Sequence, residues 1–96
     1  MNDTYQWDPD KEAINIQKHG ISFIEAETVF DDVNALYKPD IDHSYDEERF
    51  IIIGYSSELR LLIVCHCYRE NDAIVRIISA RKATNFERNE YEGKLI

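Results

Sequence analysis

Three long apolar runs separated by short polar connectors dominate the second half of this 96-residue chain. The runs cover residues 50–55, 61–68 and 73–79. Near-continuous apolar runs of this length are typical of strands that are covered on both faces of a sheet. The connectors Ser56-Ser57-Glu58 and Glu70-Asn71-Asp72 have the length of hairpin turns. The pattern therefore predicts three central strands in an antiparallel meander.

The first half of the chain predicts two helices with clear local signals. Asp8 is an N-cap residue and Pro9 suits the first helical position, so a helix is expected from Pro9 to His19. Gly20 supplies a left-handed stop, and the capping box that starts at Ser22 begins a second helix. One face of this second helix is apolar and predicts packing on a core: Phe23, Ala26, Val29 and Phe30.

The remaining elements are short. Residues 4–7 and 36–38 are strand candidates, and the capping box from Thr84 to Glu87 opens a final helix through Tyr91. The predicted order is β-α-α-β-β-β-β-α in a single domain over residues 1–96. The fold class is therefore α+β, with an antiparallel sheet packed by two N-terminal helices and a short C-terminal helix.

Charge is segregated along the chain. Residues 1–48 hold 13 acids and 3 lysines, a balance of −10, while residues 49–96 hold 6 acids and 8 bases, a balance of +2; together they give the net charge of −8. Every arginine lies in the second half. The acidity argues against indiscriminate coating of nucleic acid but leaves room for a local anion site. Arginine suits such a site because its planar fork donates two parallel hydrogen bonds to a phosphate.

Arg76 lies inside the third apolar run, and Arg81 lies two residues past its end. They are five residues apart, so in a regular strand their side chains point to opposite faces. Either Arg81 lies beyond the strand end, or only one of the two is functional. Arg81 is favoured because it precedes the start of the final helix, whose free amide groups attract anions.

A histidine is the second candidate for chemistry in these strands. Parity places Arg60, His66 and Tyr68 on one face of the second run, with Cys65 and Cys67 on the other. His66 beside an arginine could act as an acid–base group. The alternative is a core histidine satisfied by the backbone, which is the commoner role inside an apolar run. The two cysteines are expected to be reduced and structural.

Several other polar residues have an ordinary structural explanation. Glu87 is expected to cap the final helix, and His19 to cap the helix that ends at Gly20. Lys18 could be a phosphate contact or a solvated side chain. His43 lies in an acidic run that predicts a solvated loop, and no spacing there matches a metal site.

A series of short motifs runs through nearly the whole chain in a fixed order. They are Trp7-Asp8, Lys11, Asn15, Lys18 to Phe23, Glu25-Ala26, Val29 to Asp32, Asp42-His43-Ser44, Glu47 to Phe50, Gly54-Tyr55-Ser56, Arg60 to Val64, Arg76 to Thr84, and Glu87-Arg88 with Tyr91. Their order and spacing closely resemble the BrnT family of type II toxins. One difference from the expected pattern is Leu59, where a glycine would stand ahead of the arginine.

The resemblance implies a RelE-like fold and a ribonuclease that arrests translation. It also implies a cognate ribbon-helix-helix antitoxin of the BrnA type as partner, RNA as substrate, and contact with operator DNA only through that antitoxin. No apolar run is long enough to cross a membrane, and we expect a cytoplasmic protein. A second hypothesis stays open: a catalytically inactive protein-binding module that keeps only the antitoxin interface.

The expected site uses protein side chains alone, with no metal and no cofactor. Metal-independent RNA cleavage needs a base for the 2′-hydroxyl, cations for the phosphorane and an acid for the leaving oxygen. Arg88 and Tyr91 share a face of the final helix and could be either substrate contacts or structural partners. The expected catalytic residues are Arg81, Arg76, Arg60, His66 and Tyr91, and the expected substrate-binding residues are Lys18, Arg49 and Arg88.

Overall fold

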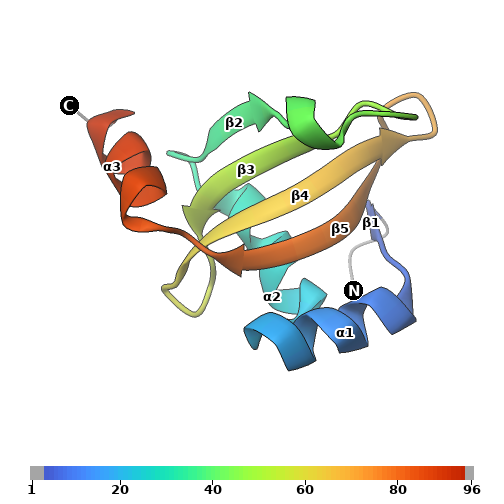
Figure 1. Cartoon of the computed structure of the whole chain (residues 1–96), viewed down its shortest axis with the longest axis horizontal. Helices are drawn as coiled ribbons and strands as arrows, with labels where there is room; N and C mark the ends of the chain where they lie inside the picture. The colour runs from blue at the N-terminus through green and yellow to red at the C-terminus, as the bar shows by residue number, and fades with distance from the viewer. Residues whose placement is uncertain (1–3, 95–96) are drawn as a thin grey trace.

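Five strands form one sheet in the order β1-β5-β4-β3-β2 (Figure 1). Their bounds are β1 Tyr5–Gln6, β2 Leu36–Pro39, β3 Phe50–Tyr55, β4 Leu61–Arg69 and β5 Ile74–Lys82. The structure is a computed structural model that describes residues 4–94. Strands β2 to β5 are antiparallel neighbours, as predicted, but β1 pairs with β5 in parallel. The sheet is therefore mixed, and the prediction of a purely antiparallel sheet was wrong at this edge.

The helices complete the predicted α+β order. Their bounds are α1 Pro9–His19, α2 Phe23–Glu27 and α3 Asn85–Lys94, with 3-10 turns η1 Thr28–Asp31 and η2 Ile41–His43. Figure 1 shows α1 along the β5 edge, α2 behind the sheet, and α3 at the end where β5 finishes. Within residues 4–94, no helix has the length and apolarity that crossing a membrane requires.

The helix signals work locally as predicted, with one exception. Gly20 has a φ of 71°, and the Ser22 hydroxyl accepts from the Glu25 amide at 3.0 Å. The Glu25 carboxylate does not close the predicted capping box, because it bonds Arg60 and Ser56 instead. Glu12 takes over that role and accepts from the Phe23 amide at 2.9 Å.

The main core lies between the sheet and the helices. Phe23, Ala26 and Val29 have no exposed surface, which confirms the predicted apolar face of the second helix. The sheet residues that meet them come from three strands: Ile52, Leu62, Val64, Ile77 and Ala80. Burial of this kind contributes about 25 cal/mol per Å² of apolar surface.

The opposite face of the sheet is covered only in part. Tyr91 of α3 packs there on Ile53, Leu61 and Ile63. The sequence predicted strands covered on both faces, but α3 covers only one end, and the segment 40–49 leans over another part of this face. Between them the sheet is open and concave. We call this surface the open face.

A β-bulge changes which side chains share the open face. Cys65 pairs with Ser79 and His66 pairs with Ile77, so Ile78 is an extra residue in β5. One inserted residue reverses the alternation of side chains along the rest of a strand. Two residues of β5 that lie on opposite sides of Ile78 and are an odd number of positions apart therefore point to the same face of the sheet.

Leu59 in the β3–β4 turn generates a prediction about stability. It has a φ of 60° and its side chain is 83% exposed. A side chain in this left-handed region is strained, whereas glycine is not. We expect Leu59→Gly to raise the free energy of unfolding by about 0.5–1 kcal/mol, measured by urea unfolding. Glu58→Gly is the control and is expected to lower stability slightly; a loss of stability in both variants would contradict the prediction.

Candidate functional site

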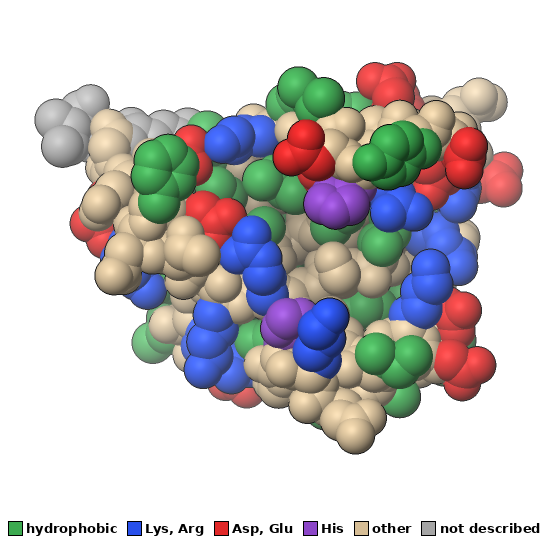
Figure 2. Space-filling view, in the orientation of Figure 1, with side chains coloured by type: hydrophobic (Ala, Val, Ile, Leu, Met, Phe, Trp, Pro, Cys, Tyr) green, Lys and Arg blue, Asp and Glu red, His purple; other side chains and the backbone are tan. Residues whose placement is uncertain are grey.

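Two adjoining cavities hollow the open face. One, of about 320 Å³, lies between η2, β3, β4 and β5, and the other, of about 190 Å³, lies between β5 and α1. They share Ile78 and Ser79, so the bulged part of β5 forms the floor common to both. Figure 2 shows Lys and Arg side chains gathered around the hollowed middle of this face. We call the two cavities together the groove.

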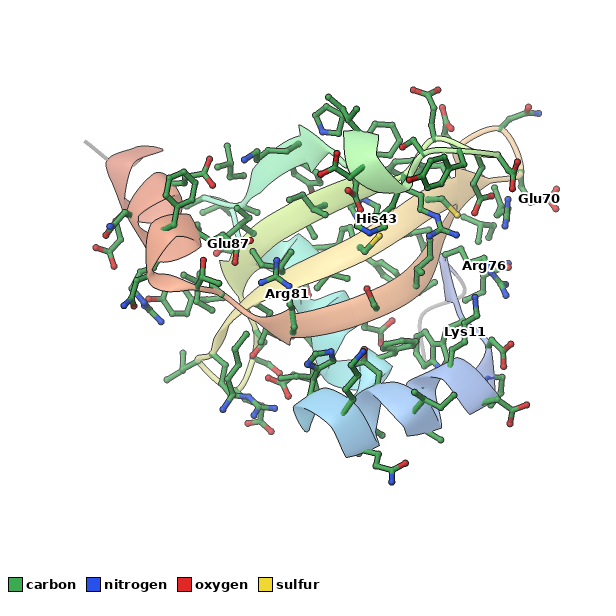
Figure 3. The ribbon with its side chains drawn as sticks, viewed as in Figure 1. Lys11, His43, Glu70, Arg76, Arg81 and Glu87 are labelled. Carbon is green, nitrogen blue, oxygen red and sulfur yellow. The ribbon has the colours of Figure 1, made fainter. Side chains whose placement is uncertain are left out.

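Arg81 rises from β5 into the larger cavity (Figure 3). Its guanidinium donates to both carboxylate oxygens of Glu87, at 2.7 and 2.8 Å. This bidentate bond raises the pKa of Arg81 and fixes the plane of its fork. Arg81 lies within the strand, not beyond its end as one of the two alternatives had it. The argument from free amides at the helix start stays a prediction; the Glu87 amide there is bonded to the Thr84 hydroxyl, and Arg81 is joined to α3 through the Glu87 carboxylate.

Glu87 also caps α3, as predicted. Its Oε1 accepts from the Thr84 amide at 2.9 Å, and its own amide donates to the Thr84 hydroxyl at 3.2 Å. The bond from Arg81 is the main reason that the pKa of Glu87 falls to about 2. One carboxylate therefore holds both the helix start and the cation of the cavity.

Arg76 lies on the same face as Arg81, which the parity argument did not allow. Arg76 pairs with Cys67 and Arg81 with Ile63, and these partners are four residues apart on β4. The bulge at Ile78 is the cause. Arg76 donates to the Gln6 side chain of β1 at 2.9 Å and does not line either cavity of the groove.

Arg49 comes from the loop before β3 and lines the larger cavity. Its Nε atom is buried and has no hydrogen-bond partner within residues 4–94; the Glu47 carboxylate is 3.7 Å away. A buried donor without a partner is unfavourable unless something binds it. Arg49 shares the larger cavity with Arg81.

Lys18 lines the smaller cavity, in agreement with its possible role as a phosphate contact. Lys11 and His19 of the same helix line it as well. Lys11 was not among the predicted site residues. The spacing of Lys11 and Lys18, two helical turns apart on one face, was the available signal.

Arg60 lies away from the groove. It donates to both carboxylate oxygens of Glu25 and to the Gly20 carbonyl, and the bond to Glu25 lowers the pKa of that carboxyl. Ser56 donates to the same carboxylate at 2.7 Å. Arg60 thus ties the β3–β4 turn to the start of α2, which is a structural role.

His66 has no exposed surface and points into the helix-side core. Its Nδ1 lies 3.1 Å from the Val64 carbonyl oxygen, and its ring packs edge-on against Phe30 at 4.9 Å. Burial lowers the pKa of His66, so the ring is neutral. This is the core arrangement that was the alternative in the sequence analysis, and it leaves His66 out of reach of a substrate.

Tyr91 and Arg88 hold α3 in place. The Tyr91 hydroxyl donates to Asp32 at 2.7 Å, and burial raises its pKa to about 12. Asp32 also accepts from the Tyr55 amide at 2.8 Å, and a Cβ on Gly54 would lie 3.1 Å from it. Arg88 donates to the Tyr55 hydroxyl at 3.2 Å. Neither side chain lines the groove.

The sequence analysis missed two residues that the structure brings together at the groove. His43 and Asp40 both line the larger cavity, and the imidazole Nδ1 lies 3.0 Å from the Asp40 carboxylate. The acidic run had predicted a solvated loop. The only local signal was the three-residue spacing, which aligns side chains in a helical turn.

Metal-binding chemistry has no site among residues 4–94, where no three His, Cys, Asp or Glu side chains form a cluster that could hold an ion. Cys65 and Cys67 are both free thiols. Burial is the main cause that raises the pKa of the Cys65 thiol to about 12. This agrees with a structural role and not a reactive one.

Comparison with known proteins gives two matches to one family. The sequence profile of the ribonuclease toxin BrnT of type II toxin-antitoxin systems matches residues 7–87. Among solved structures, the Brucella abortus ribonuclease toxin BrnT is similar with a TM-score of 0.62 and 27% identity, over 82% of this chain and 94% of that one. No curated protein matches the chain in sequence. The RelE-like assignment stays a prediction.

The Arg81–Glu87 pair generates a prediction about pH. The pKa of Glu87 falls from 4.5 to about 2 on folding, so its stabilising effect is complete above pH 4.5 and is lost as the pH falls toward 2. We expect Glu87→Gln to lower the free energy of unfolding by about 1–2 kcal/mol at pH 7, after allowance for solvent screening. Urea unfolding at a series of pH values should show this deficit shrinking below pH 4.5. Glu92→Gln on the same helix is the control, and a deficit that does not change with pH would refute the assignment.

Proposed function

Because the chain belongs to the BrnT family of ribonuclease toxins of type II toxin-antitoxin systems, we propose that it cleaves RNA in the groove of its open face. The cleavage is internal to the RNA and inhibits translation. The phosphate lies in the larger cavity against Arg81 and Arg49, and the RNA backbone continues past Lys11 and Lys18. The proposal thus assigns four of the chain's 11 Lys and Arg residues to the site.

The observation that carries the proposal is the gathering of cations in one concave surface of an acidic protein. The net charge is −8, yet Lys11 and Lys18 line the smaller cavity with no acid beside them, and Arg49 and Arg81 line the larger one together with Asp40 and Asp42. Across the two cavities the bases outnumber the acids, although acids outnumber bases in the chain as a whole. Phosphate contacts need this arrangement, and they position a nucleic acid before any chemistry.

The chemistry uses the RNA's own 2′-hydroxyl as nucleophile. The guanidinium groups of Arg81 and Arg49 stabilise the charge that develops on phosphorus oxygens in the transition state. Glu87 keeps the Arg81 fork in one orientation, so little reorganisation is needed when the charge develops. The Arg49 side chain, which is 31% exposed, brings a second guanidinium group to the same cavity.

A toxin of this class has an antitoxin as partner. We propose that the partner is a ribbon-helix-helix protein of the BrnA type, and that operator DNA is contacted through it. The acidity of the chain supports the proposal that the antitoxin, and not this chain, contacts the DNA, because duplex DNA binds to broad basic surfaces and the groove is narrow.

Growth arrest by Arg81 variants tests the proposed function. Expression of the unmutated chain without antitoxin should arrest growth, and Arg81→Ala should lower RNA cleavage by about 10²–10³-fold and relieve the arrest. Lys82→Ala is the matched control, because Lys82 pairs with Leu62 and lies on the helix side of the sheet. Thermal unfolding of both variants checks that Arg81→Ala still folds. Soluble unmutated protein without growth arrest would instead support the inactive module.

The salt dependence of RNA binding tests the proposed path of the RNA backbone past Lys11 and Lys18 of α1. The probe is a single-stranded 2′-O-methyl RNA, which binds but offers no nucleophile. Each phosphate contact in single strands contributes about 0.7 to the slope of log affinity against log salt, so removing Lys11 and Lys18 together should reduce the slope by about 1.4. Lys38→Ala, which breaks an ion pair with Glu90 outside the groove, should leave it unchanged. Equal slopes for the double variant and the unmutated chain would place RNA elsewhere.

A further inference from the structure

His43 and Asp40 form a pair with defined geometry at the edge of the groove. Nδ1 of His43 lies 3.0 and 3.1 Å from the two carboxylate oxygens of Asp40. A carboxylate in this position binds the N–H form of Nδ1, which leaves the lone pair on Nε2. The His43 side chain is 64% exposed, so Nε2 is accessible, while the Asp40 side chain is only 16% exposed.

The loop that carries the pair is held closed by backbone bonds. The Asp40 amide donates to the Arg49 carbonyl at 2.8 Å, which extends the β2–β3 ladder by one bond. The Ser44 hydroxyl donates to the Asp40 carbonyl at 2.7 Å and accepts from the Arg49 amide at 3.0 Å. Asp40 and Arg49 are therefore fixed relative to each other.

A thiol fixes the Asp40 carboxylate to the sheet. Cys65 of β4 donates to Asp40 Oδ2 at 3.5 Å. Burial keeps this thiol protonated, so it acts as a donor. The carboxylate thus joins η2 to β4, and the orientation of His43 is set by the sheet.

The pair shares its cavity with both arginines of the proposed phosphate site. Asp40, His43, Arg49 and Arg81 line the same space of about 320 Å³. Figure 3 shows His43 reaching over the middle of the sheet and Arg81 rising from β5 toward the same region. Of the other two histidines, His66 is buried and His19 lines the neighbouring cavity.

We propose that His43, oriented by Asp40, is the general base of the RNA cleavage; the inference rests on the proposed function. His43 Nε2 takes the proton of the 2′-hydroxyl, the 2′-oxygen bonds to phosphorus, and the bond from phosphorus to the 5′-oxygen breaks. The 5′-oxygen takes a proton from water, and His43 returns its proton to solvent. The products are a 2′,3′-cyclic phosphate and a 5′-hydroxyl end.

The alternative is a structural role, in which the pair only stabilises the η2 turn. An exposed pair of this kind contributes little to stability. Loss of His43 would then leave cleavage almost unchanged, and no small molecule could replace it. The two roles therefore give different results in a cleavage assay.

The test measures RNA cleavage in a cell extract that contains ribosomes, so that free and ribosome-bound RNA are both offered. We expect His43→Ala to reduce the rate by about 10²–10⁴-fold, and added imidazole to restore part of it. Imidazole should not restore Arg81→Ala. Asp40→Asn should reduce the rate at least about tenfold, because an amide donates to Nδ1 and favours the wrong tautomer. Glu48→Gln in the same loop is the charge-matched control, because Glu48 lines neither of the cavities that His43 lines.

The pH profile is the second readout. The titratable groups that share a cavity with His43 come from four places: Asp40 just before η2 and Asp42 within it, Tyr45, Asp46, Glu47 and Arg49 of the following loop, Cys65 of β4, and Arg81 of β5. A general base must be unprotonated to take a proton, so the unmutated protein should lose activity toward acidic pH. His43→Ala should lose this dependence.

Three outcomes decide between the proposals. Cleavage that is lost in Arg81→Ala but unchanged in His43→Ala overturns the role of His43 and leaves the proposed function standing. The role of His43 is also overturned if the cleavage rate lost in His43→Ala is not restored by imidazole and this variant keeps the pH dependence of the unmutated protein. No cleavage by the unmutated protein removes both proposals.

Discussion

The contact between Asn15 and Ala80 fixes the geometry on which the groove depends. The Asn15 amide donates to the Ala80 carbonyl at 2.9 Å and accepts from the Ala80 amide at 3.1 Å, as a neighbouring strand would. Its second N–H donates to the Ile21 carbonyl, which holds the turn between α1 and α2. Each of these groups is buried, and leaving one unpaired would cost about 1–3 kcal/mol. Asn15 therefore sets α1 against β5, and with it the distance across the groove from Lys18 to Arg81.

Local signals predicted the elements well, because each signal acts within a few residues. Pro9 and Gly20 bound α1 at the expected residues, and the three apolar runs are the three long strands. The predictions that failed depended on partners that are distant in the sequence. The Glu25 carboxylate left its capping box for Arg60, thirty-five residues away in sequence. The bulge at Ile78 depends on how β4 and β5 align, and no residue type in the sequence marks it. Counting along a regular strand therefore placed Arg76 and Arg81 on opposite faces, although they share one.

The candidate site was predictable only in part for the same reason. Arg81 stood out because a cation before a capping box is visible in the sequence. Arg60 and Tyr91 were reasonable candidates by residue type, but Glu25 and Asp32 bind them from other segments. His43 looked like part of a solvated run, and only the folding of this loop over β4 brings it beside Asp40 in the larger cavity. Residue types thus indicated the chemistry required, whereas the tertiary fold decided which side chains can supply it.

The acidity of the chain and its cationic groove are compatible because charges act over short distances in salt. At physiological ionic strength the Debye length is about 8 Å, so acids on the far side of the molecule barely affect a phosphate bound in the groove. They do weaken long-range attraction, since the net charge is −8. Binding of RNA, as proposed, must then depend on direct contacts with Arg49, Arg81 and the lysines of α1. A single strand can enter two small adjoining cavities and make these contacts, whereas a duplex needs a broad basic surface. On the proposed function, the same acidity that disfavours nonspecific coating also restricts binding to RNA that fits the groove.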